Sequence, residues 1–433
     1  MKVELAEAYQ NTELGQEAES LLMPCVQCGQ CTFTCPTFRL TNDEWDGPRG
    51  RIYLIKQFLE GKEPGLDLLP PAYTLKTLEG RTLGQNLQLH LDRCLTCRSC
   101  ETSCPQDVHY GRLLDIGREL VEKQVSRPFK ERFMRQMLRT VVAHRRGFST
   151  FLKLGQLFRR ILPDELRSMV PVRRKAGVWP GQDRPRKMLI WQGCVQPDLA
   201  PDINAAAARV LDRFGIELIP TAEGCCGALS QHMAETEEAR DFMRKNIDAI
   251  WPYIEQGAEA IVLTASGCGM QFREYGELLK DDPQYGEKAR RISALTRDIA
   301  EIVGEEWSRQ SSTSPSDQSN TNKTRRRIAF QSSCSLQHGE KLNGVTEKLL
   351  KQAGFKLVPV AYPFMCCGAA GTYSILQRAF SKSLRAMKLE SLLASRPETI
   401  ATANIGCLTH LSAVSPVPVR HWIELLDEKL ENN

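Results

Sequence analysis

One cysteine pattern occurs twice in the first quarter of the chain. Two residues separate each of the first three cysteines, three residues precede the fourth, and a proline follows. The two sets are Cys25, Cys28, Cys31, Cys35 with Pro36, and Cys94, Cys97, Cys100, Cys104 with Pro105. An iron–sulfur cubane needs four inward-facing thiolates, and three cysteines on one winding loop can supply three of them. The duplicated pattern therefore predicts two [4Fe–4S] clusters.

The fourth cysteine of each set is expected to serve the other cluster. The proline after it redirects the chain, and in two-cluster ferredoxins with this spacing the fourth cysteine ligates the neighbouring cluster. Structural zinc would leave no use for a third cysteine per loop, and a reducing compartment disfavours disulfides. The first predicted ligand set is Cys25, Cys28, Cys31 and Cys104, and the second is Cys35, Cys94, Cys97 and Cys100.

Eight further cysteines form two matching sets in the second half of the chain. These candidate metal ligands are Cys194, Cys225, Cys226, Cys268 and Cys334, Cys366, Cys367, Cys407. The adjacent pair follows the first cysteine by 31 and 32 positions, and the last cysteine follows the pair by 42 and 40. Packing as small buried hydrophobes is one interpretation. The repetition, with a glycine after each pair, favours metal or redox ligation and predicts additional clusters.

The second group of cysteines belongs to an internal repeat of strands and helices. Three strands per copy are expected at 188–191, 216–220 and 260–264, and at 328–331, 355–360 and 399–403, with helices at 203–214 and 341–353. Alternating strands and helices form parallel sheets through right-handed crossovers. The cysteines follow the carboxyl ends of the strands, where open α/β sheets build their sites.

The predicted fold is α+β and multidomain: an α-helical, ferredoxin-like N-terminal domain followed by two repeated α/β units with parallel sheets. Five segments are expected, namely the ferredoxin-like domain at 1–120, a helical basic connector at 121–186, a first Cys-Cys-Gly (CCG) unit at 187–307, a disordered linker at 308–326 and a second CCG unit at 327–433. The linker is expected because residues 308–324 contain no apolar side chain to anchor them.

Composition and charge indicate an ordinary soluble protein of the cytoplasm. The 433 residues include 16 cysteines, carry a net charge of +5, and begin without an apolar signal segment. No stretch approaches the roughly 20 apolar residues of a membrane span. Basic runs at 159–175 and 323–327 are expected to be solvated surface. Docking on an acidic partner, or peripherally on the cytoplasmic face of the inner membrane, is the alternative. No nucleic-acid partner is expected.

The arrangement resembles a known family. Each CCG unit resembles the cysteine-rich domain of the heterodisulfide reductase catalytic subunit. Two ferredoxin motifs joined to two such units resemble, over essentially the whole chain, the iron–sulfur subunit of bacterial glycolate oxidase. The segments 47–51 (GPRGR), 191–194 (WQGC) and 418–425 (PVRHWIEL) fit that subunit as well.

The resemblance implies an electron-transfer subunit of an oxidoreductase complex. Flavin-containing partner subunits would oxidise glycolate to glyoxylate, and this subunit would pass the electrons to a quinone or another acceptor. The chain has no glycine-rich dinucleotide fingerprint of its own, so flavin is expected on the partners only and no catalytic residue is assigned here.

Two departures from the relatives keep alternatives open. Gln271 and His410 stand where heterodisulfide reductase relatives have the second cysteine of a Cys-x-x-Cys pair. His410 is expected to be a structural histidine rather than a ligand. Alternative functions are the equivalent subunit of a glycerol-3-phosphate or lactate dehydrogenase, a heterodisulfide-reductase-like enzyme, and a scaffold whose CCG cysteines only pack. Arg49 and Arg51 would raise cluster potentials if they lie nearby; a turn leading into a helix is the other interpretation of their segment.

Overall fold

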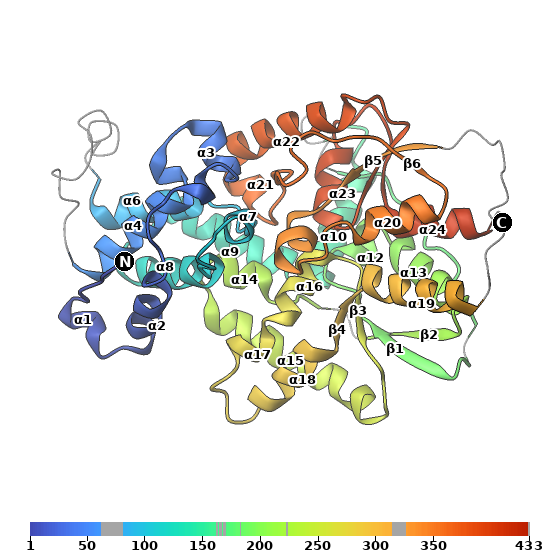
Figure 1. Ribbon diagram of the computed structural model, residues 1–433, viewed down its shortest axis with the longest axis horizontal. Coiled ribbons are helices and arrows are strands. Elements are labelled where there is room, and N and C mark those ends of the chain that lie inside the picture. Colours follow the sequence, from blue (N-terminus) through green and yellow to red (C-terminus); the bar gives the residue numbers. More distant parts are fainter. Residues whose placement is uncertain are drawn as a thin grey trace. The chain divides into compact units, whose positions relative to one another are not determined.

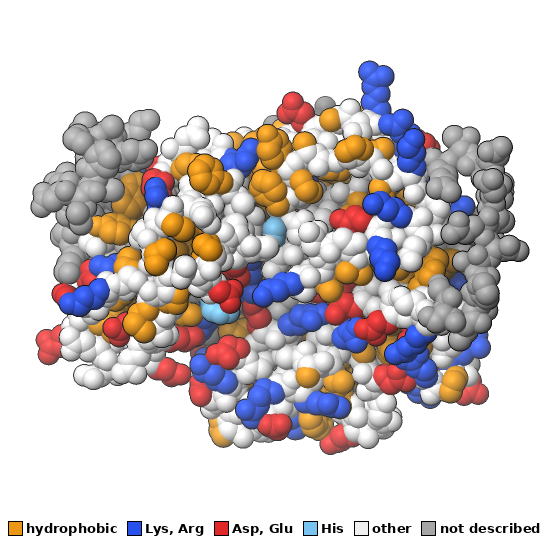
Figure 2. All heavy atoms as spheres, viewed as in Figure 1, with side chains coloured by type: hydrophobic (Ala, Val, Ile, Leu, Met, Phe, Trp, Pro, Cys, Tyr) orange, Lys and Arg blue, Asp and Glu red, His pale blue; other side chains and the backbone are white. Residues whose placement is uncertain are grey.

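The computed structural model describes residues 1–61, 81–161, 163, 167, 170–181, 183–221, 224–313 and 326–431 (Figure 1). The chain divides into two compact units. Unit 1 comprises Met1–Arg135, Gln231–Thr236 and Phe364–Leu384, and unit 2 comprises Gln136–Ser230, Glu237–Pro363 and Arg385–Asn433. On the face drawn in Figure 2, Lys and Arg side chains alternate with Asp and Glu, so that face has no large region of a single charge sign.

Unit 1 is helical at its N-terminal part. Four longer helices pack against one another: α2 (Glu13–Leu22), α4 (Pro48–Leu59), α6 (Leu83–Asp92) and α8 (Tyr110–Gln124). The short elements between them are α1 (Glu7–Gln10), η1 (Gln30–Thr32), α3 (Pro36–Thr41), η2 (Glu44–Asp46) and α7 (Ser99–Thr102). Leucines that are fully buried, among them Leu22, Leu87 and Leu113, fill the space between the helices. The helices thereby hold the loops that carry the first eight cysteines.

Unit 2 contains two parallel sheets with the same topology. The first sheet has the order β2-β1-β3-β4, formed by β1 (Arg186–Ile190), β2 (Ile216–Pro220), β3 (Ile261–Leu263) and β4 (Thr296–Asp298). The second has the order β6-β5-β7-β8, formed by β5 (Arg327–Gln331), β6 (Lys356–Leu357), β7 (Thr399–Thr402) and β8 (Val419–His421). The identical order shows that the internal repeat is structural, and the α+β multidomain fold class is confirmed.

The remaining helices precede, connect or follow the strands along the chain. They are α9 (Phe129–Val142), α10 (Arg145–Leu157), α12 (Gln196–Leu199), α13 (Asp202–Asp212), α14 (Ala228–His232), α15 (Thr236–Glu255), α16 (Ser266–Arg273), α17 (Tyr275–Leu278), α18 (Gly286–Leu295), α19 (Ile299–Thr313), the π-helix η4 (Ser335–Gly339), α20 (Val345–Gln352), α21 (Tyr373–Leu376), α22 (Arg378–Leu393), α23 (Ile405–Ser412) and α24 (Trp422–Glu431).

Several elements differ from the sequence-based expectation. Each sheet has four strands, whereas three were expected. The additional strands, β4 and β8, were not predicted because each is only three residues long and mostly polar. Strand β6 ends at Leu357, two residues before Pro359, which cannot donate to a sheet ladder. The helix expected from residue 341 begins at Val345, after Gly344 in a left-handed conformation.

Of the linker expected at 308–326, residues 314–325 lie outside the described residues. Helix α19 extends to Thr313 and includes the first six linker residues, 308–313. The continuing backbone hydrogen bonds of that helix compensate for the absence of apolar side chains there.

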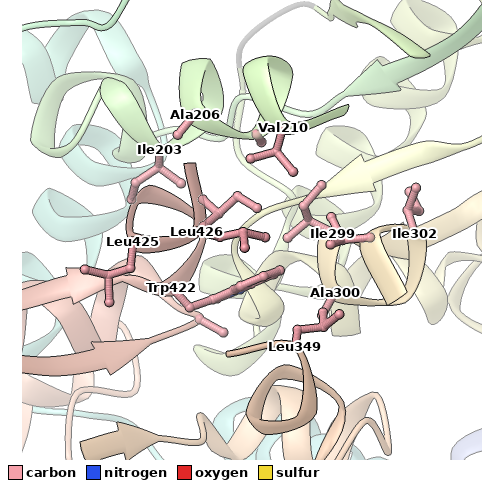
Figure 3. Packing of buried hydrophobic residues seen from close by; sticks show 14 of the residues in the cluster. Ile203, Ala206, Val210, Ile299, Ala300, Ile302, Leu349, Trp422, Leu425 and Leu426 are labelled. Carbon is pink, nitrogen blue, oxygen red and sulfur yellow. The ribbon is translucent and has the colours of Figure 1, made fainter. Parts of the chain in front are cut away.

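The two copies of the repeat share one hydrophobic core. Helix α13 packs on α24, and α19 packs on α20, so each pair takes one helix from each copy. Figure 3 shows Trp422 of α24 lying among Ile299 and Ala300 of α19 and Leu349 of α20. Trp422 is fully buried. These helices also pack on strands of their own copy, so the shared core joins the two sheets within unit 2.

Candidate iron–sulfur centres

The two ferredoxin-type loops adopt the same unusual backbone conformation. At the second position after the first cysteine, Gln27 and Thr96 have φ of 58° and 53°. At the fourth position, Gly29 and Arg98 have φ of 79° and 56°. Non-glycine residues rarely adopt this left-handed region, and three of them at equivalent positions mark a conformation that the surrounding structure enforces. Two residues with positive φ within each seven-residue stretch curve the loop, so that it can enclose a bound cluster.

The first predicted ligand set surrounds one cavity. This cavity is lined by Cys25, Cys28, Cys31 and Cys104, and Cys100 also borders it. The first three come from one loop, whereas Cys104 comes from the other loop, 73 positions further along the chain. The structure therefore brings together the four thiols expected for the first cluster.

Two thiols of this set, Cys25 and Cys31, resist ionisation in the absence of a compensating cation. Burial raises the pKa of Cys31 to about 12, with further contributions from the neighbouring Cys25, Cys104 and Cys28 thiols. Burial also raises the pKa of Cys25. Like charges at close range destabilise one another, and a positively charged iron cluster removes that cost while taking all four thiolates as ligands. The donor set and its cavity fit a [4Fe–4S] cluster.

The second predicted ligand set is grouped in the same way. Burial raises the pKa of Cys100 well above its ordinary value, and Cys97, Cys94 and Cys35 are the thiols that raise it further. Cys35 again comes from the opposite loop. Its sulfur lies 3.2 Å from the hydroxyl of Thr37. The four residues thus form a second crowded thiol group that fits a second cluster.

A buried arginine lies beside this second group. The Nη1 of Arg51 is 3.9 Å from the sulfur of Cys35, its Nη2 donates to Thr37 Oγ1 at 3.1 Å, and its Nε donates to the carbonyl of His90 at 2.7 Å. The carboxylate of Asp46 is 3.7 Å from Arg51. Burial opposes ionisation of Asp46, but the hydrogen bond with His90 and the charge of Arg51 keep its pKa below the usual range.

The neighbouring arginine serves the first group. Arg49 lines the cavity of the first ligand set. A Cβ on Gly29 would lie 2.8 Å from Arg49 Nη1, so the guanidinium lies against the first loop. Its Nε donates to Glu44 at 2.7 Å, and its side chain is 39% exposed, whereas that of Arg51 is 1% exposed. Two arginines separated by one residue therefore lie at different ligand sets.

Sequence reasoning missed the residue that fixes the second loop. Arg118 of α8 donates from Nη2 to the carbonyls of Leu91 and Cys94, both at 3.0 Å, and from Nη1 to Thr96 Oγ1 at 3.0 Å. These bonds hold the left-handed residue Thr96 and the first cysteine of the loop. No local pattern signals this role, because Arg118 shares the buried face of α8 with another charged residue, Asp115.

The four cysteines of the first CCG unit come together in unit 2. Cys194 is hydrogen-bonded to Cys225, Cys225 to Cys226, and Cys226 to Cys268. The bonds from Cys194 and Cys226 hold the pKa of Cys225 well below its ordinary value, whereas the pKa values of Cys194 and Cys226 are raised. Four thiols linked one to the next, one of them already favoured as a thiolate, are a donor set that fits a metal cluster.

The glycine of each CCG motif has a defined structural role. Gly227 and Gly368 have φ of 93° and 86°. Their N–H groups donate to the sulfurs of Cys225 and Cys366 at 3.4 and 3.5 Å. A Cβ would lie 3.0 Å from the carbonyl oxygen of Ala239 at Gly227, and 2.8 Å from that of Ser381 at Gly368. Only glycine combines this conformation with that close backbone approach.

Two buried side chains hold the first CCG loop. Asn246 Nδ2 donates to the carbonyl of Cys225 at 2.9 Å, and the Tyr275 hydroxyl donates to the carbonyl of Cys226 at 2.8 Å. Asn246 Nδ2 also donates to the Tyr275 oxygen at 2.8 Å. Neither residue was singled out from the sequence, because an asparagine and a tyrosine in helical segments carry no spacing pattern that links them to the cysteine pair.

The cysteines of the second CCG unit are divided between the two units. Cys334 follows β5 and Cys407 lies in α23 after β7, both in unit 2, whereas Cys366 and Cys367 belong to unit 1. Within unit 1, burial raises the pKa of Tyr373, and Cys366 and Cys94 are among the groups that add to the rise.

In unit 2 the cysteine loops of both copies meet. The Ser266 hydroxyl lies 2.7 Å from those of Ser333 and Ser335, and Asn404 Nδ2 donates to Ser266 and Ser335 at 3.2 Å. These residues are the near neighbours of Cys268, Cys334 and Cys407 in the sequence. A buried hydrogen-bond cluster therefore ties three candidate ligand loops together.

The two departures from the heterodisulfide reductase pattern lie at different depths. Gln271 is 1% exposed on α16, three residues after Cys268, and its amide nitrogen has no hydrogen-bond partner among the described residues. His410 is half-buried on α23, and its carbonyl accepts a hydrogen bond from Arg385 at 3.4 Å.

Comparison with known proteins assigns the chain to a class. Residues 22–108 match the family model of the 4Fe-4S dicluster domain, and residues 188–273 and 328–412 each match that of the cysteine-rich domain. These matches enclose the cysteine loops described above. Fold and site together define an iron–sulfur electron-transfer protein built from one dicluster domain and two cysteine-rich domains.

Relatives narrow the class to one family. The chain is 46% identical over 433 residues to the glycolate oxidase iron-sulfur subunit of Escherichia coli (strain K12), covering all of both chains. It therefore belongs to the glycolate oxidase iron–sulfur subunit family. It is 28% identical to the probable glycolate oxidase iron-sulfur subunit of Bacillus subtilis (strain 168), over 91% of this chain and 89% of the relative. It is 23% identical to lactate utilization protein A of Bacillus licheniformis, over 56% of this chain and all of the relative.

Family membership confirms the expected class of oxidoreductase subunit and its iron–sulfur cofactors, and implies partner subunits. Across the described residues, no helix has both the length and the apolar composition required to cross a membrane.

Proposed function

We propose that this chain receives electrons from flavin-containing partner subunits that oxidise glycolate to glyoxylate, and passes them toward a quinone. The grouping of Cys104 with the three cysteines of the opposite loop carries the proposal, because it builds the first of two neighbouring thiol sets. Full-length similarity to a glycolate oxidase iron-sulfur subunit supports the choice of substrate. The substrate chemistry is assigned to the partners.

The ligand assignment follows the two thiol groups. Cys25, Cys28, Cys31 and Cys104 hold one [4Fe–4S] cluster, and Cys35, Cys94, Cys97 and Cys100 hold the other. When bound, the clusters supply centres that accept and release single electrons. The chain itself fixes the positions of the ligands through the left-handed residues of the loops and through Arg118.

The two arginines set different electrostatic environments. Arg51 is fully buried near Cys35, where low dielectric strengthens its field, and its partner Asp46 is shared with Arg93, so the three groups together keep a net positive charge. Arg49 is partly exposed and paired with Glu44, so solvent and its partner weaken its effect. A buried cation favours the added negative charge of reduction, so the centre on the second ligand set has the higher reduction potential. Electrons therefore pass from the first ligand set to the second.

The CCG cysteines are proposed to hold further clusters. Cys194, Cys225, Cys226 and Cys268 supply four contacting thiols, and Cys334, Cys366, Cys367 and Cys407 are the matching set of the second copy. Gly227 and Gly368 donate N–H bonds to the sulfurs of Cys225 and Cys366, which stabilises a thiolate ligand. The chain is proposed to work in the cytoplasm, with peripheral contact to the inner membrane.

A second candidate function is the same role in a lactate-oxidising complex. The similarity to lactate utilization protein A, over 56% of the chain, favours it among the alternatives. A heterodisulfide-reductase-like activity is less well supported, because Gln271 and His410 replace the cysteines that such sites use.

Purification of the native complex under anaerobic conditions tests the assignment. Glycolate, lactate and glycerol-3-phosphate would each be offered with a dye acceptor, and flavin, iron and sulfide would be measured on the same preparation. Glycolate-dependent dye reduction is expected, with flavin on other subunits and at least eight irons on this chain. Turnover of lactate or glycerol-3-phosphate alone would assign the chain to a different dehydrogenase, and an iron-free chain would refute electron transfer altogether.

A further inference from the structure

Helix α10 presents a large apolar face that the described part of the chain leaves uncovered. None of its residues is buried. The exposed fractions of Phe151, Leu154 and Leu157 are 62%, 47% and 73%. Phe158 and Ile161, directly after the helix, are 49% and 78% exposed. Intervals of three and four residues place all five on one side of the helical path.

Basic side chains border this apolar face. Lys153 and Arg160 are exposed, and with about 100° of rotation per residue they lie along one edge of the apolar stripe. Residues 145–175 contain nine Lys or Arg and two Asp or Glu. The segment thus combines exposed apolar side chains with an excess of positive charge.

The following segment fixes the helix within unit 2. Gln156 Nε2 donates to the carbonyl of Pro171 at 3.2 Å, and Arg159 Nε donates to that of Val170 at 2.9 Å. Val172, next to these anchors, is 66% exposed. The apolar stripe is therefore part of a folded surface, and its exposure is a property of the native unit.

We propose that the apolar stripe of α10, with its flanking lysine and arginine side chains, binds the surface of an anionic lipid bilayer. Interfacial helices combine Phe and Leu on one face with Lys and Arg beside it, and lie in the plane of the headgroups. Seven of the nine basic residues in 145–175 are arginines, and the guanidinium group binds phosphate oxygens bidentately. Anionic headgroups complement the nine basic residues.

This inference deepens the peripheral membrane placement within the proposed function. It does not depend on which hydroxy acid the partner subunits oxidise. An acceptor dissolved in the bilayer would be reached from a subunit held in this way.

Vesicle flotation of the full chain, purified anaerobically with its clusters, tests the proposal. Phosphatidylcholine vesicles would be compared with vesicles that also contain phosphatidylglycerol. Binding is expected only to the anionic vesicles, and added salt should weaken it. The double variant Leu157→Gln/Ile161→Gln should reduce binding roughly tenfold or more, because buried apolar area drives insertion. Lys153→Gln/Arg160→Gln should weaken the preference for anionic lipid, because seven of the nine basic residues remain.

Tyr362→Gln is the control, since Tyr362 is 53% exposed in the same unit and does not line the surface that contains Arg174 and Lys175. It should float like the wild-type chain. Circular dichroism and iron content must be unchanged in every variant. Absence of wild-type flotation, equal flotation on neutral vesicles, or wild-type binding by the Leu157→Gln/Ile161→Gln variant would each overturn the proposal. Loss of a copurifying subunit in that variant, without any lipid binding by the wild type, would assign the stripe to a protein partner instead.

Discussion

The Nη1 nitrogen of Arg51 lies 3.9 Å from the sulfur of Cys35, and the guanidinium that carries it is fully buried. Its charge is balanced by Asp46, which also receives hydrogen bonds from Arg93 and His90 at 2.9 and 2.8 Å. A cation held this way cannot move away from the cysteine when the charge of the ligand set changes. Its effect on reduction is therefore permanent and can be measured.

Arg51→Met should lower the reduction potential of one of the two ferredoxin-type centres. Removal of this buried charge, which Asp46 partly compensates, is expected to lower the reduction potential by roughly 60 mV. For a one-electron couple this corresponds to a tenfold change in the equilibrium constant of reduction. Potentiometric titration followed by electron paramagnetic resonance measures the shift. Arg51→Lys should restore most of it.

Arg49→Met is the control, and it should move the other centre, by a smaller amount, because Arg49 is partly exposed. If both variants shift the same centre, the assignment of one arginine to each ligand set is wrong.

Exchange of the fourth cysteines is tested by Cys104→Ser and Cys35→Ser. Cys104→Ser should change the spectrum of the centre that Cys25, Cys28 and Cys31 hold, since these four line one cavity. Cys35→Ser should change the other centre. Iron analysis and electron paramagnetic resonance of each variant, compared with Cys28→Ser and Cys97→Ser, identify the affected centre. If Cys104→Ser and Cys97→Ser changed the spectrum of the same centre, the proposed exchange of the fourth cysteines would be wrong.

Gly227→Ala should destabilise unit 2 and weaken iron binding at the first CCG set. The variant places a Cβ 3.0 Å from Ala239 O at a φ of 93°. The conformational part of this cost is about 1–2 kcal/mol, and the close contact adds to it. Gly257→Ala separates the two terms, because Gly257 has a φ of 92° with no atom within 4 Å of the added Cβ. Urea unfolding and iron content report both effects, and equal losses in the two variants would show that the contact is unimportant.

Acid should destabilise unit 2 through His421. Burial lowers the pKa of this histidine to about 4, and its Nε2 donates to the carbonyl of Thr264 at 2.9 Å. The unfolded chain protonates it near pH 6.5, so the unfolded state binds more protons between pH 6.5 and 4. Stability therefore falls as the pH falls through this window, by about 2 kcal/mol between pH 7 and 5.

His421→Gln should flatten that pH dependence, because glutamine can keep the bond to Thr264 without taking up a proton. Thermal midpoints of the wild type and variant at pH 7 and 5 provide the comparison. An unchanged slope in the variant would exclude His421 as the cause.

The cysteine chemistry could be predicted from sequence because its spacing is local. Strand β2, at Ile216–Pro220, coincides with the predicted range, because its apolar residues alternate clearly. Strands β4 (TRD) and β8 (VRH) carry no such pattern and form only because a neighbouring strand pairs with them. Asp46 and Arg118 look like surface charges in the sequence. Their buried role depends on partners 22 to 47 positions away, which no local pattern encodes.

Because α13 packs on α24 and α19 packs on α20, a destabilising substitution in one copy of the repeat also affects the other copy. A substitution that loosens Trp422 in the second copy removes the cover from α19 in the first. We therefore expect the two halves to lose stability together when this shared core is disrupted. Evolution could vary the cysteine loops of each copy separately, but only on a scaffold that both copies maintain jointly.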